Sequence, residues 1–340
     1  MIDLSSNINP FYPTKNMYLY LHRNLNKIKK YSNKHIDVSD DGVLNKYNLK
    51  NDNVLVTSGT LGAMDLILRT NTGKNIGLFN PTFWGIREIA KINNNSINEK
   101  RLKVNSRYNL NDIDTLSSES DLLYLCNCNN PTLNYIEKEE LIEIIRKNKN
   151  CLFIIDETVL IFDEQYDNKT LLKYVNEIQN LIVLVSLSKI IGICGLRIGL
   201  LITSASQRNK YLKKQVPYSN NVLSSVFLEK YFKKVFELDN CKAKIRSNFN
   251  YLINNIDMSL INKIIYNSSS FLLIELKDIV DYTDLVEFIL KNQVKVSAIN
   301  DYYKNLDKKY LRISAGTKSE YKKLIKIFIK YKNSILKEGR

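Results

Sequence analysis

The chain has 340 residues, 44% of them hydrophobic and 25% charged, which is typical of a globular protein with a large buried core. The net charge is +15, but the lysines are spread along the chain and are not gathered with aromatic residues, so we expect a solvated surface that favours anionic substrates and no nucleic-acid partner. Five cysteines, an odd number, and only two histidines argue against a disulfide framework and against a metal site.

In the first two thirds of the chain, short apolar runs alternate with amphipathic stretches. Strands are expected at 54–56, 76–79, 122–125, 151–155 and 181–185. Helices are expected at 61–69, 86–92 and 137–146. This alternation predicts an α/β fold with a mostly parallel sheet and helices on both faces. In such sheets, ligands bind outside the carboxyl ends of the strands.

The last third of the chain has a different pattern, which predicts a smaller α+β domain. A helical region at 223–253 precedes apolar runs at 264–266, 271–274, 294–296 and 310–313, and a helix is expected from Lys318 onward. We place the large domain at 36–235. We expect residues 1–35 to join residues 236–340 in the small domain.

The apolar region 181–204 is long enough to suggest a membrane span, but its composition argues against one. It contains two cations, Lys189 and Arg197, and three glycines, and each charge would be costly in lipid. We therefore expect no membrane association. After Met1 there is no charged segment followed by an apolar run, so no signal peptide is expected. The cysteines are expected to be reduced thiols in the core. Together with the expected absence of a signal peptide, they predict a cytoplasmic location.

Lys189 directly follows the strand expected at 181–185, and its neighbours have a distinctive chemistry. Ser186 and Ser188 supply hydroxyl groups, and Arg197 supplies a guanidinium between glycines eight positions later. An amine at the end of a buried strand can form a Schiff base with an aldehyde, while the hydroxyls and the guanidinium can bind a phosphate. Pyridoxal 5'-phosphate (PLP) needs this combination of groups.

The segment 186–199 resembles the S-x-S-K-x-x-G-x-x-G-L-R-x-G signature of fold-type I PLP enzymes in the class I/II aminotransferase group. Further motifs extend the resemblance from about residue 3 to residue 335, in the expected order. The histidinol-phosphate aminotransferases and the threonine-phosphate decarboxylases of this group are the most similar. The resemblance implies the PLP-dependent transferase fold of type I, with a smaller α+β C-terminal domain.

The resemblance also implies cofactor contacts at specific residues. Lys189 and Asp156 would be catalytic, with Lys189 as the Schiff-base lysine and Asp156, after the strand at 151–155, paired with the ring nitrogen. The other expected cofactor contacts are Gly59, Thr60, Phe83, Asn130, Ser186, Ser188, Arg197 and Tyr31. By residue chemistry alone, Gly59 and Thr60 could equally belong to a capped helix start, Asn130 to a turn and Phe83 to the core.

The remaining implied residues concern the substrate and the partner subunit. Arg312, in a segment similar to R-I-x-x-G-T, would bind a substrate carboxylate in a bidentate pair. Asn9, in an N-x-N-P segment, would approach the same carboxylate. Tyr31 would reach the PLP phosphate of a second subunit, which implies a homodimer.

Two positions depart from the family pattern. Leu133 stands where a glycine usually follows Asn-Pro-Thr, and Val159 stands where the aminotransferases carry a tyrosine that contacts the cofactor. We predict a PLP-dependent aminotransferase that acts on an α-amino acid, with phosphorylated amino acids among the candidates, and with a keto acid as the second substrate. The apolar Val159 keeps a decarboxylase of the threonine-phosphate type open as the alternative. A non-catalytic PLP-fold sensor is a further alternative, disfavoured because Lys189 and Asp156 are both present.

Overall fold

The computed structural model describes residues 1–38, 42–104, 107–267, 269–303, 306 and 308–337, which form two compact units. Unit 1 contains Met1–Phe11, Phe162–Glu164 and Asp239–Arg340. Unit 2 contains Tyr12–Ile161 and Gln165–Leu238.

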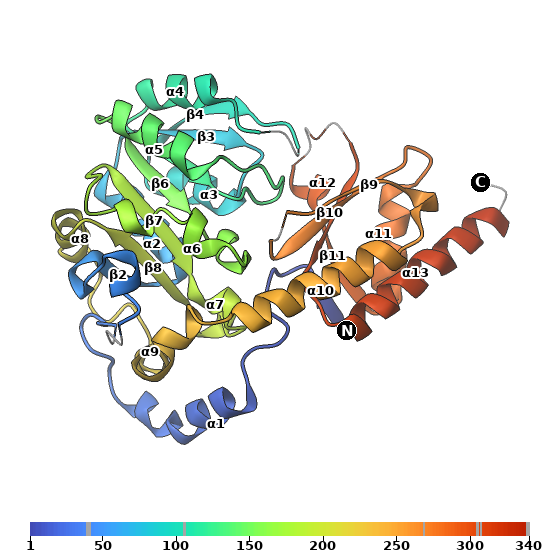
Figure 1. Cartoon of the computed structure of the whole chain (residues 1–340), viewed down its shortest axis with the longest axis horizontal. Helices are drawn as coiled ribbons and strands as arrows, with labels where there is room; N and C mark the ends of the chain where they lie inside the picture. The colour runs from blue at the N-terminus through green and yellow to red at the C-terminus, as the bar shows by residue number, and fades with distance from the viewer. Residues whose placement is uncertain (39–41, 105–106, 268, 304–305, 307, 338–340) are drawn as a thin grey trace. The chain divides into compact units, whose positions relative to one another are not determined.

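Unit 2 is built on a seven-stranded sheet, counted over the described residues, with helices on both of its faces (Figure 1). From one edge to the other, its strands are β2 (Val54–Ser58), β8 (Ile198–Thr203), β7 (Leu181–Ser186), β6 (Leu152–Asp156), β5 (Leu122–Cys126), β3 (Asn75–Asn80) and β4 (Ser96–Arg101). β8 runs antiparallel to both of its neighbours, and the other pairs are parallel. The predicted α/β fold with a mostly parallel sheet is confirmed.

The helices of unit 2 are α1 (Lys15–Arg23), α2 (Gly59–Thr70), α3 (Trp84–Ile92), α4 (Leu110–Ser118), α5 (Lys138–Lys147), α6 (Tyr166–Lys169), α7 (Leu187–Ile190), α8 (Ala205–Leu212) and α9 (Val222–Val235). Helices of unit 2, such as α2 and α3, bury apolar side chains against this sheet, and α1 packs on α9. Met64 and Ile67 of α2 pack with Ile86 of α3 against Tyr124 and Leu184 of the sheet, and all of these side chains are buried. Alternate residues of β5, β6 and β7 thus face this core, as the period of a strand requires.

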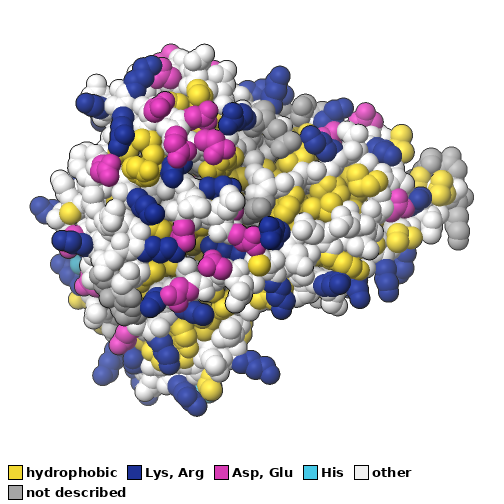
Figure 2. Space-filling view, in the orientation of Figure 1, with side chains coloured by type: hydrophobic (Ala, Val, Ile, Leu, Met, Phe, Trp, Pro, Cys, Tyr) yellow, Lys and Arg dark blue, Asp and Glu magenta, His cyan; other side chains and the backbone are white. Residues whose placement is uncertain are grey.

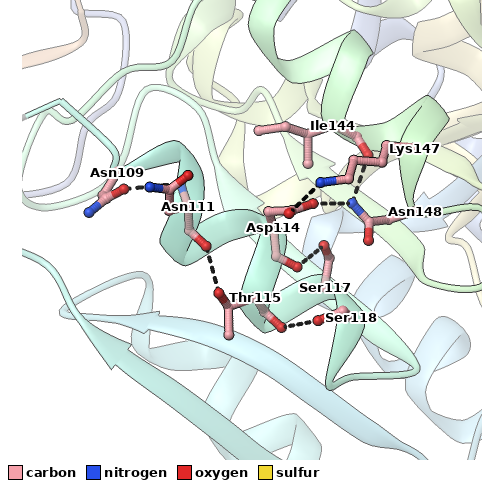
Figure 3. Close-up of polar contacts among 9 residues, drawn as sticks. All are labelled: Asn109, Asn111, Asp114, Thr115, Ser117, Ser118, Ile144, Lys147 and Asn148. Carbon is pink, nitrogen blue, oxygen red and sulfur yellow. Dashed lines mark hydrogen bonds and ion pairs between the residues drawn. The ribbon is translucent and has the colours of Figure 1, made fainter.

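α4 and α5 are linked by the carboxylate of Asp114 (Figure 3). It accepts hydrogen bonds from Lys147 Nζ at 2.6 Å and from Asn148 Nδ2 at 2.9 Å, and these bonds lower the pKa of Asp114. Asn109 caps α4 by accepting from the backbone N of Asn111 at 3.0 Å. These contacts fix α5, which follows the loop that leaves β5.

Unit 1 contains a five-stranded sheet, counted over the described residues, in the order β1, β11, β12, β10, β9. Its strands are β1 (Ile2–Leu4), β9 (Ile261–Ile265), β10 (Phe271–Leu276), β11 (Val294–Ala298) and β12 (Tyr310–Ser314). Its helices are α10 (Asp239–Asn255), α11 (Tyr282–Lys291), α12 (Ile299–Tyr302) and α13 (Lys318–Lys337). β1 pairs in parallel with β11, so the start of the chain joins the small α+β unit.

Residues 12–35, which we predict to belong to the small domain, lie in unit 2 instead. α1 packs on α9, where the rings of Tyr20 and Tyr231 meet edge to face at 5.4 Å. The hydroxyl of Tyr231 also donates to the backbone O of Asn16 at 3.4 Å. The first boundary between the units therefore lies between Phe11 and Tyr12, and no change in amino-acid composition marks it.

Within the described residues, no helix combines the length and apolar character that a membrane span requires. The side chains of Lys and Arg are scattered over the visible face among those of Asp and Glu (Figure 2). No stripe of basic side chains crosses this face.

Candidate active site

Five predicted site segments come together at one edge of the sheet in unit 2. Lys189 lies in α7 after β7, Asp156 ends β6, Asn130 follows β5, Phe83 follows β3 and Gly59 follows β2. These strands all point the same way, because β8 reverses direction between β2 and β7. Their carboxyl ends therefore meet at the edge where ligands bind in sheets of this kind.

Gly59 and Arg197 form a closely fitted pair at the start of α2. Gly59 has a φ of +72°, and a Cβ added to it would lie 2.5 Å from Arg197 Nη2. The backbone N of Gly59 donates to the backbone O of Arg197 at 3.1 Å. Thr60 follows as a buried residue in the first turn of α2. A guanidinium beside the amino end of a helix is a site for a phosphate.

Gly199 keeps this turn compact from the other side. A Cβ at Gly199 would lie 2.4 Å from the backbone C of Gly59 and 2.5 Å from the backbone N of Thr60. The Thr57 hydroxyl donates to the backbone O of both glycines, at 3.0 Å for Gly59 and 3.2 Å for Gly199. Gly59 and Gly199 thus allow the two backbone segments to approach closely, because neither residue has a side chain.

Ser186 and Ser188 are both buried, and the structure gives the Ser188 hydroxyl a specific task. It accepts from the backbone N of Ile198 at 2.6 Å and donates to the backbone O of the same residue at 3.0 Å. Ser188 therefore fastens α7 to the start of β8. Ser186 ends β7 and stands as the N-cap residue of α7.

The amine of Lys189 lies 5.8 Å from the centroid of the Phe83 ring. Lys189 lies in α7, just after β7, and Phe83 is the N-cap residue of α3 after β3. The sequence predicts a Schiff-base amine and a stacking ring at these two positions, and the structure brings the two side chains near one another.

The carboxylate of Asp156 is buried and receives two hydrogen bonds from the chain. Its Oδ2 accepts from the Tyr124 hydroxyl at 2.8 Å, and its Oδ1 accepts from the backbone N of Thr158 at 2.9 Å. Burial, and next the charge of Asp156, raise the pKa of Tyr124, so this phenol keeps the proton that it donates. Tyr124 is not among the residues that the motifs identify, because it occupies an ordinary core position of β5.

Asn129 is a second site residue that the motifs do not identify, and it joins two loops. Its Nδ2 donates to the backbone O of Pro81 at 2.9 Å and to the Thr132 hydroxyl at 2.5 Å. Its Oδ1 accepts from the Thr82 hydroxyl at 2.7 Å. Asn129 thus connects the loops that carry Phe83 and Asn130, and it is fully buried.

Leu133 has a φ of +61°, in the left-handed region that favours glycine. The Leu133 side chain is buried, and a non-glycine residue thus holds a left-handed conformation in this loop.

Tyr31 is 88% exposed on unit 2, and its ring packs on that of Tyr218 with 5.5 Å between centroids. A hollow of about 510 Å³ adjoins it, lined by residues that include Gly195 and Leu196. These two residues lie just before Arg197 in the chain.

The two predicted substrate residues lie in unit 1. Arg312 of β12 is inserted between apolar residues, with its guanidinium 5.3 Å from the Phe271 ring and its Nη2 donating to the backbone O of Ser5 at 2.5 Å. Burial lowers the pKa of Arg312 to about 10, which still leaves it charged at neutral pH. Asn9 is fully buried, and its Nδ2 donates to Cys241 Sγ at 3.1 Å.

The residues of unit 2 fit PLP in three independent respects. The Lys189 amine matches the aldehyde, the buried carboxylate of Asp156 matches a ring nitrogen that carries a proton, and the turn at Gly59 and Arg197 matches the phosphate. The turn is the sharpest of the three matches, because a side chain at Gly59 would collide with the guanidinium. Within the described residues, no group of three or more His, Cys, Asp or Glu side chains is placed to hold a metal ion.

The family model for aminotransferase class I and II matches residues 1–328 of this chain. A histidinol-phosphate aminotransferase of Christiangramia forsetii is 31% identical over 290 residues, which cover 83% of this chain and 79% of the relative. An L-serine phosphate decarboxylase of Campylobacter jejuni is 29% identical over 287 residues, 81% of this chain and 73% of the relative.

The solved structure of a histidinol-phosphate aminotransferase from Sinorhizobium meliloti, in complex with pyridoxal-5'-phosphate, is similar in fold. The TM-score is 0.82 at 14% sequence identity, and the match covers 98% of this chain and 91% of that one. At this level of identity, the similarity concerns the fold.

Proposed function

The chain belongs to the aminotransferase class I and II family, whose cofactor is PLP, and we propose that its amino donor is a phosphorylated amine or amino acid. The prediction of a PLP-dependent aminotransferase is confirmed by this membership. Two observations support a phosphorylated donor. The names of an aminotransferase relative and of a decarboxylase relative both contain a phosphate ester, histidinol phosphate in one and serine phosphate in the other. The net charge of +15 also favours anionic substrates.

When bound, PLP withdraws electrons from the α-carbon of the substrate amine. The single observation that carries the proposed activity is the approach of the Lys189 amine to Phe83 at the edge where Asp156 ends β6. Lys189 would bind the cofactor aldehyde and, once released from it, move the proton at the substrate α-carbon as a general acid and base. Asp156 would hold a proton at the ring nitrogen, and Asn130 would donate to the phenolic oxygen.

Arg312 would bind an anionic group of the substrate, and Asn9 would assist it. A buried guanidinium that remains charged suits a bidentate pair with a carboxylate or a phosphate. In the second half of the reaction, a keto acid would present its own carboxylate to the same guanidinium.

A single half-reaction, without a keto acid, tests the activity and its donor. The PLP-loaded protein is mixed with amino acids, with their phosphate esters and with histidinol phosphate. We expect stoichiometric conversion of the cofactor to its amino form with a phosphorylated donor, and no release of carbon dioxide. Conversion by unphosphorylated amino acids alone would exclude the phosphorylated donor. Lys189→Ala should remove the visible absorbance of the bound cofactor and the half-reaction together.

Decarboxylation of a phosphorylated amino acid is a second candidate, favoured by Val159. This residue is 2% exposed and occupies the position at which the aminotransferases carry a tyrosine. An apolar side chain there cannot donate to the cofactor, and a modest change in how the substrate carboxylate is held decides which bond breaks. Repeated release of carbon dioxide in the same half-reaction, with the cofactor returned to its starting form, would establish this activity.

We also propose a homodimer that forms through the surface around Tyr31. Three large apolar or aromatic side chains that line the hollow here are exposed: Ile28, Tyr31 and Tyr218. Exposed apolar groups of this size mark interaction surfaces, and the hollow beside Tyr31 adjoins the segment that leads to Arg197. Sedimentation analysis of Ile28→Glu tests the surface, since a monomer is expected where the wild type is a dimer.

The chain is proposed to act in the cytoplasm. All five cysteines are free thiols, and four of them are buried, which suits a reducing compartment. Fractionation of cells that express the tagged protein tests the location.

A further inference from the structure

Tyr124 and Asp156 are diagonal neighbours on adjacent parallel strands. In the register of β5 and β6, Tyr124 lies beside Ile154 and Cys126 lies beside Asp156. The two side chains are therefore two positions apart along the strands and point to the same face of the sheet. A phenol is long enough to span a diagonal pair, whereas most side chains are not.

The hydrogen bond that results has an ordinary length and lies in buried surroundings. The Tyr124 hydroxyl donates to Asp156 Oδ2 at 2.8 Å, and both residues are almost fully buried. A buried carboxylate is costly unless donors stabilise its charge. The second donor, the backbone N of Thr158, takes the other oxygen. The two donors approach different oxygens and so define the plane of the carboxylate.

We propose that Tyr124 is a positioning residue for the reaction, holding the Asp156 carboxylate in the single orientation in which it meets the ring nitrogen of PLP. The inference rests on the role proposed for Asp156. Tyr124 itself does not touch the cofactor in this proposal. Its effect passes through Asp156, because a carboxylate that rotates away would no longer hold the proton at the ring nitrogen. The Thr158 amide alone, bound to one oxygen, leaves that rotation possible.

A matched control separates this role from a purely structural one. Tyr108 is also a buried tyrosine of unit 2, and its hydroxyl donates to the backbone O of Cys126 at 3.1 Å. Tyr108→Phe and Tyr124→Phe therefore each remove one phenol hydroxyl from a buried hydrogen bond near β5. The two variants differ in the acceptor, which is a backbone carbonyl in one and the Asp156 carboxylate in the other.

The experiment measures two properties of the bound cofactor in the wild type, Tyr124→Phe, Tyr108→Phe and Asp156→Asn. The first is the dissociation constant of PLP, from titration of the apoprotein followed by protein fluorescence. The second is the pH midpoint of the visible absorbance of the bound cofactor. Loss of an outer hydrogen-bond partner weakens a binding site by ten- to a hundredfold in metal centres, and we expect about tenfold for Tyr124→Phe here. We also expect a shifted pH midpoint, with both properties unchanged in Tyr108→Phe.

Two results would overturn the proposal. In one, Asp156→Asn changes both properties and Tyr124→Phe changes neither, so that the hydroxyl has no influence on the site. In the other, Tyr124→Phe and Tyr108→Phe change both properties equally, which would show a general loss of packing. If Asp156→Asn itself leaves both properties unchanged, the role proposed for Asp156 fails, and that failure is distinct from the first two.

Discussion

The guanidinium of Arg197 occupies the space that a side chain at Gly59 would need. A Cβ there would lie 2.5 Å from Arg197 Nη2, and the φ of +72° is one that residues with a Cβ rarely adopt. The two residues are brought together by the antiparallel pairing of β2 with β8, in which Ser58 lies beside Ile198. The glycine and the arginine of two separate motifs thus depend on one another.

Gly59→Ala should therefore weaken cofactor binding as well as strain the backbone. The substitution costs about 1–2 kcal/mol in backbone strain and also displaces the guanidinium. We expect the dissociation constant of PLP to rise at least tenfold, measured by titration of the apoprotein. Gly62→Ala, one turn further along α2, is the control, since its Cβ would have nothing closer than 3.4 Å. Equal PLP affinity in both variants would contradict the assignment of this turn to the phosphate.

The positions of the site segments could be predicted from the sequence because each follows an apolar run. Parallel strands end at the same edge, so Lys189, Asp156 and Asn130 are expected together without knowledge of side-chain geometry. The contact of Tyr124 with Asp156 could not be predicted, since it depends on the register of β5 against β6. A tyrosine in a strand has the same local signal whether or not its hydroxyl meets a carboxylate.

The hydrogen bonds between Ser188 and the backbone of Ile198 could not be predicted, for a similar reason. The position of Ser188 next to Lys189 in the sequence predicts a phosphate contact. Its partner, Ile198, lies ten residues away and is reached only because β8 folds back antiparallel to β7. The membership of residues 12–35 in unit 2 depends likewise on packing between α1 and α9, which no local pattern encodes.

Ser188→Ala should reduce stability more than cofactor affinity. The variant leaves the buried backbone N–H of Ile198 without its acceptor, at a cost of about 1–3 kcal/mol. Thermal unfolding of the apoprotein measures this loss, which should appear without PLP. A variant with wild-type stability but much weaker PLP binding would instead support a direct phosphate contact.

Asn129 and Thr82 should control the positions of both Phe83 and Asn130. Thr82→Val removes the hydroxyl that donates to Asn129 Oδ1 at 2.7 Å, whereas Thr82→Ser retains it. We expect Thr82→Val to raise the dissociation constant of PLP severalfold and Thr82→Ser to remain close to the wild type. The comparison isolates the hydrogen bond, since valine has nearly the shape of threonine. If Thr82→Ser weakens binding and Thr82→Val does not, the packing of the methyl group and not the hydroxyl is responsible.

Glu157 is a buried carboxyl group whose protonation should make stability depend on pH. It accepts from the Thr170 hydroxyl at 2.6 Å and from the backbone N of Leu171 at 2.8 Å. Burial raises its pKa from 4.5 to about 7, and the charge of Asp156 adds to the rise while the hydrogen bonds oppose it. The folded protein therefore holds this proton more tightly than the unfolded chain does.

The sign of the effect follows from that difference. Below pH 4.5 the stabilising contribution of the protonated group is complete, and it is lost as the pH rises through about 7. Over this window the loss amounts to about 3 kcal/mol, by the conversion of 1.36 kcal/mol for each pH unit. Glu157→Gln keeps a neutral group in place and should not lose stability in this way. In urea unfolding, we expect the free energy of unfolding of Glu157→Gln to rise relative to that of the wild type between pH 5 and pH 8. Glu139→Gln, at an exposed site on α5, should show no such gain, and an equal trend in both would assign the pH dependence to other groups.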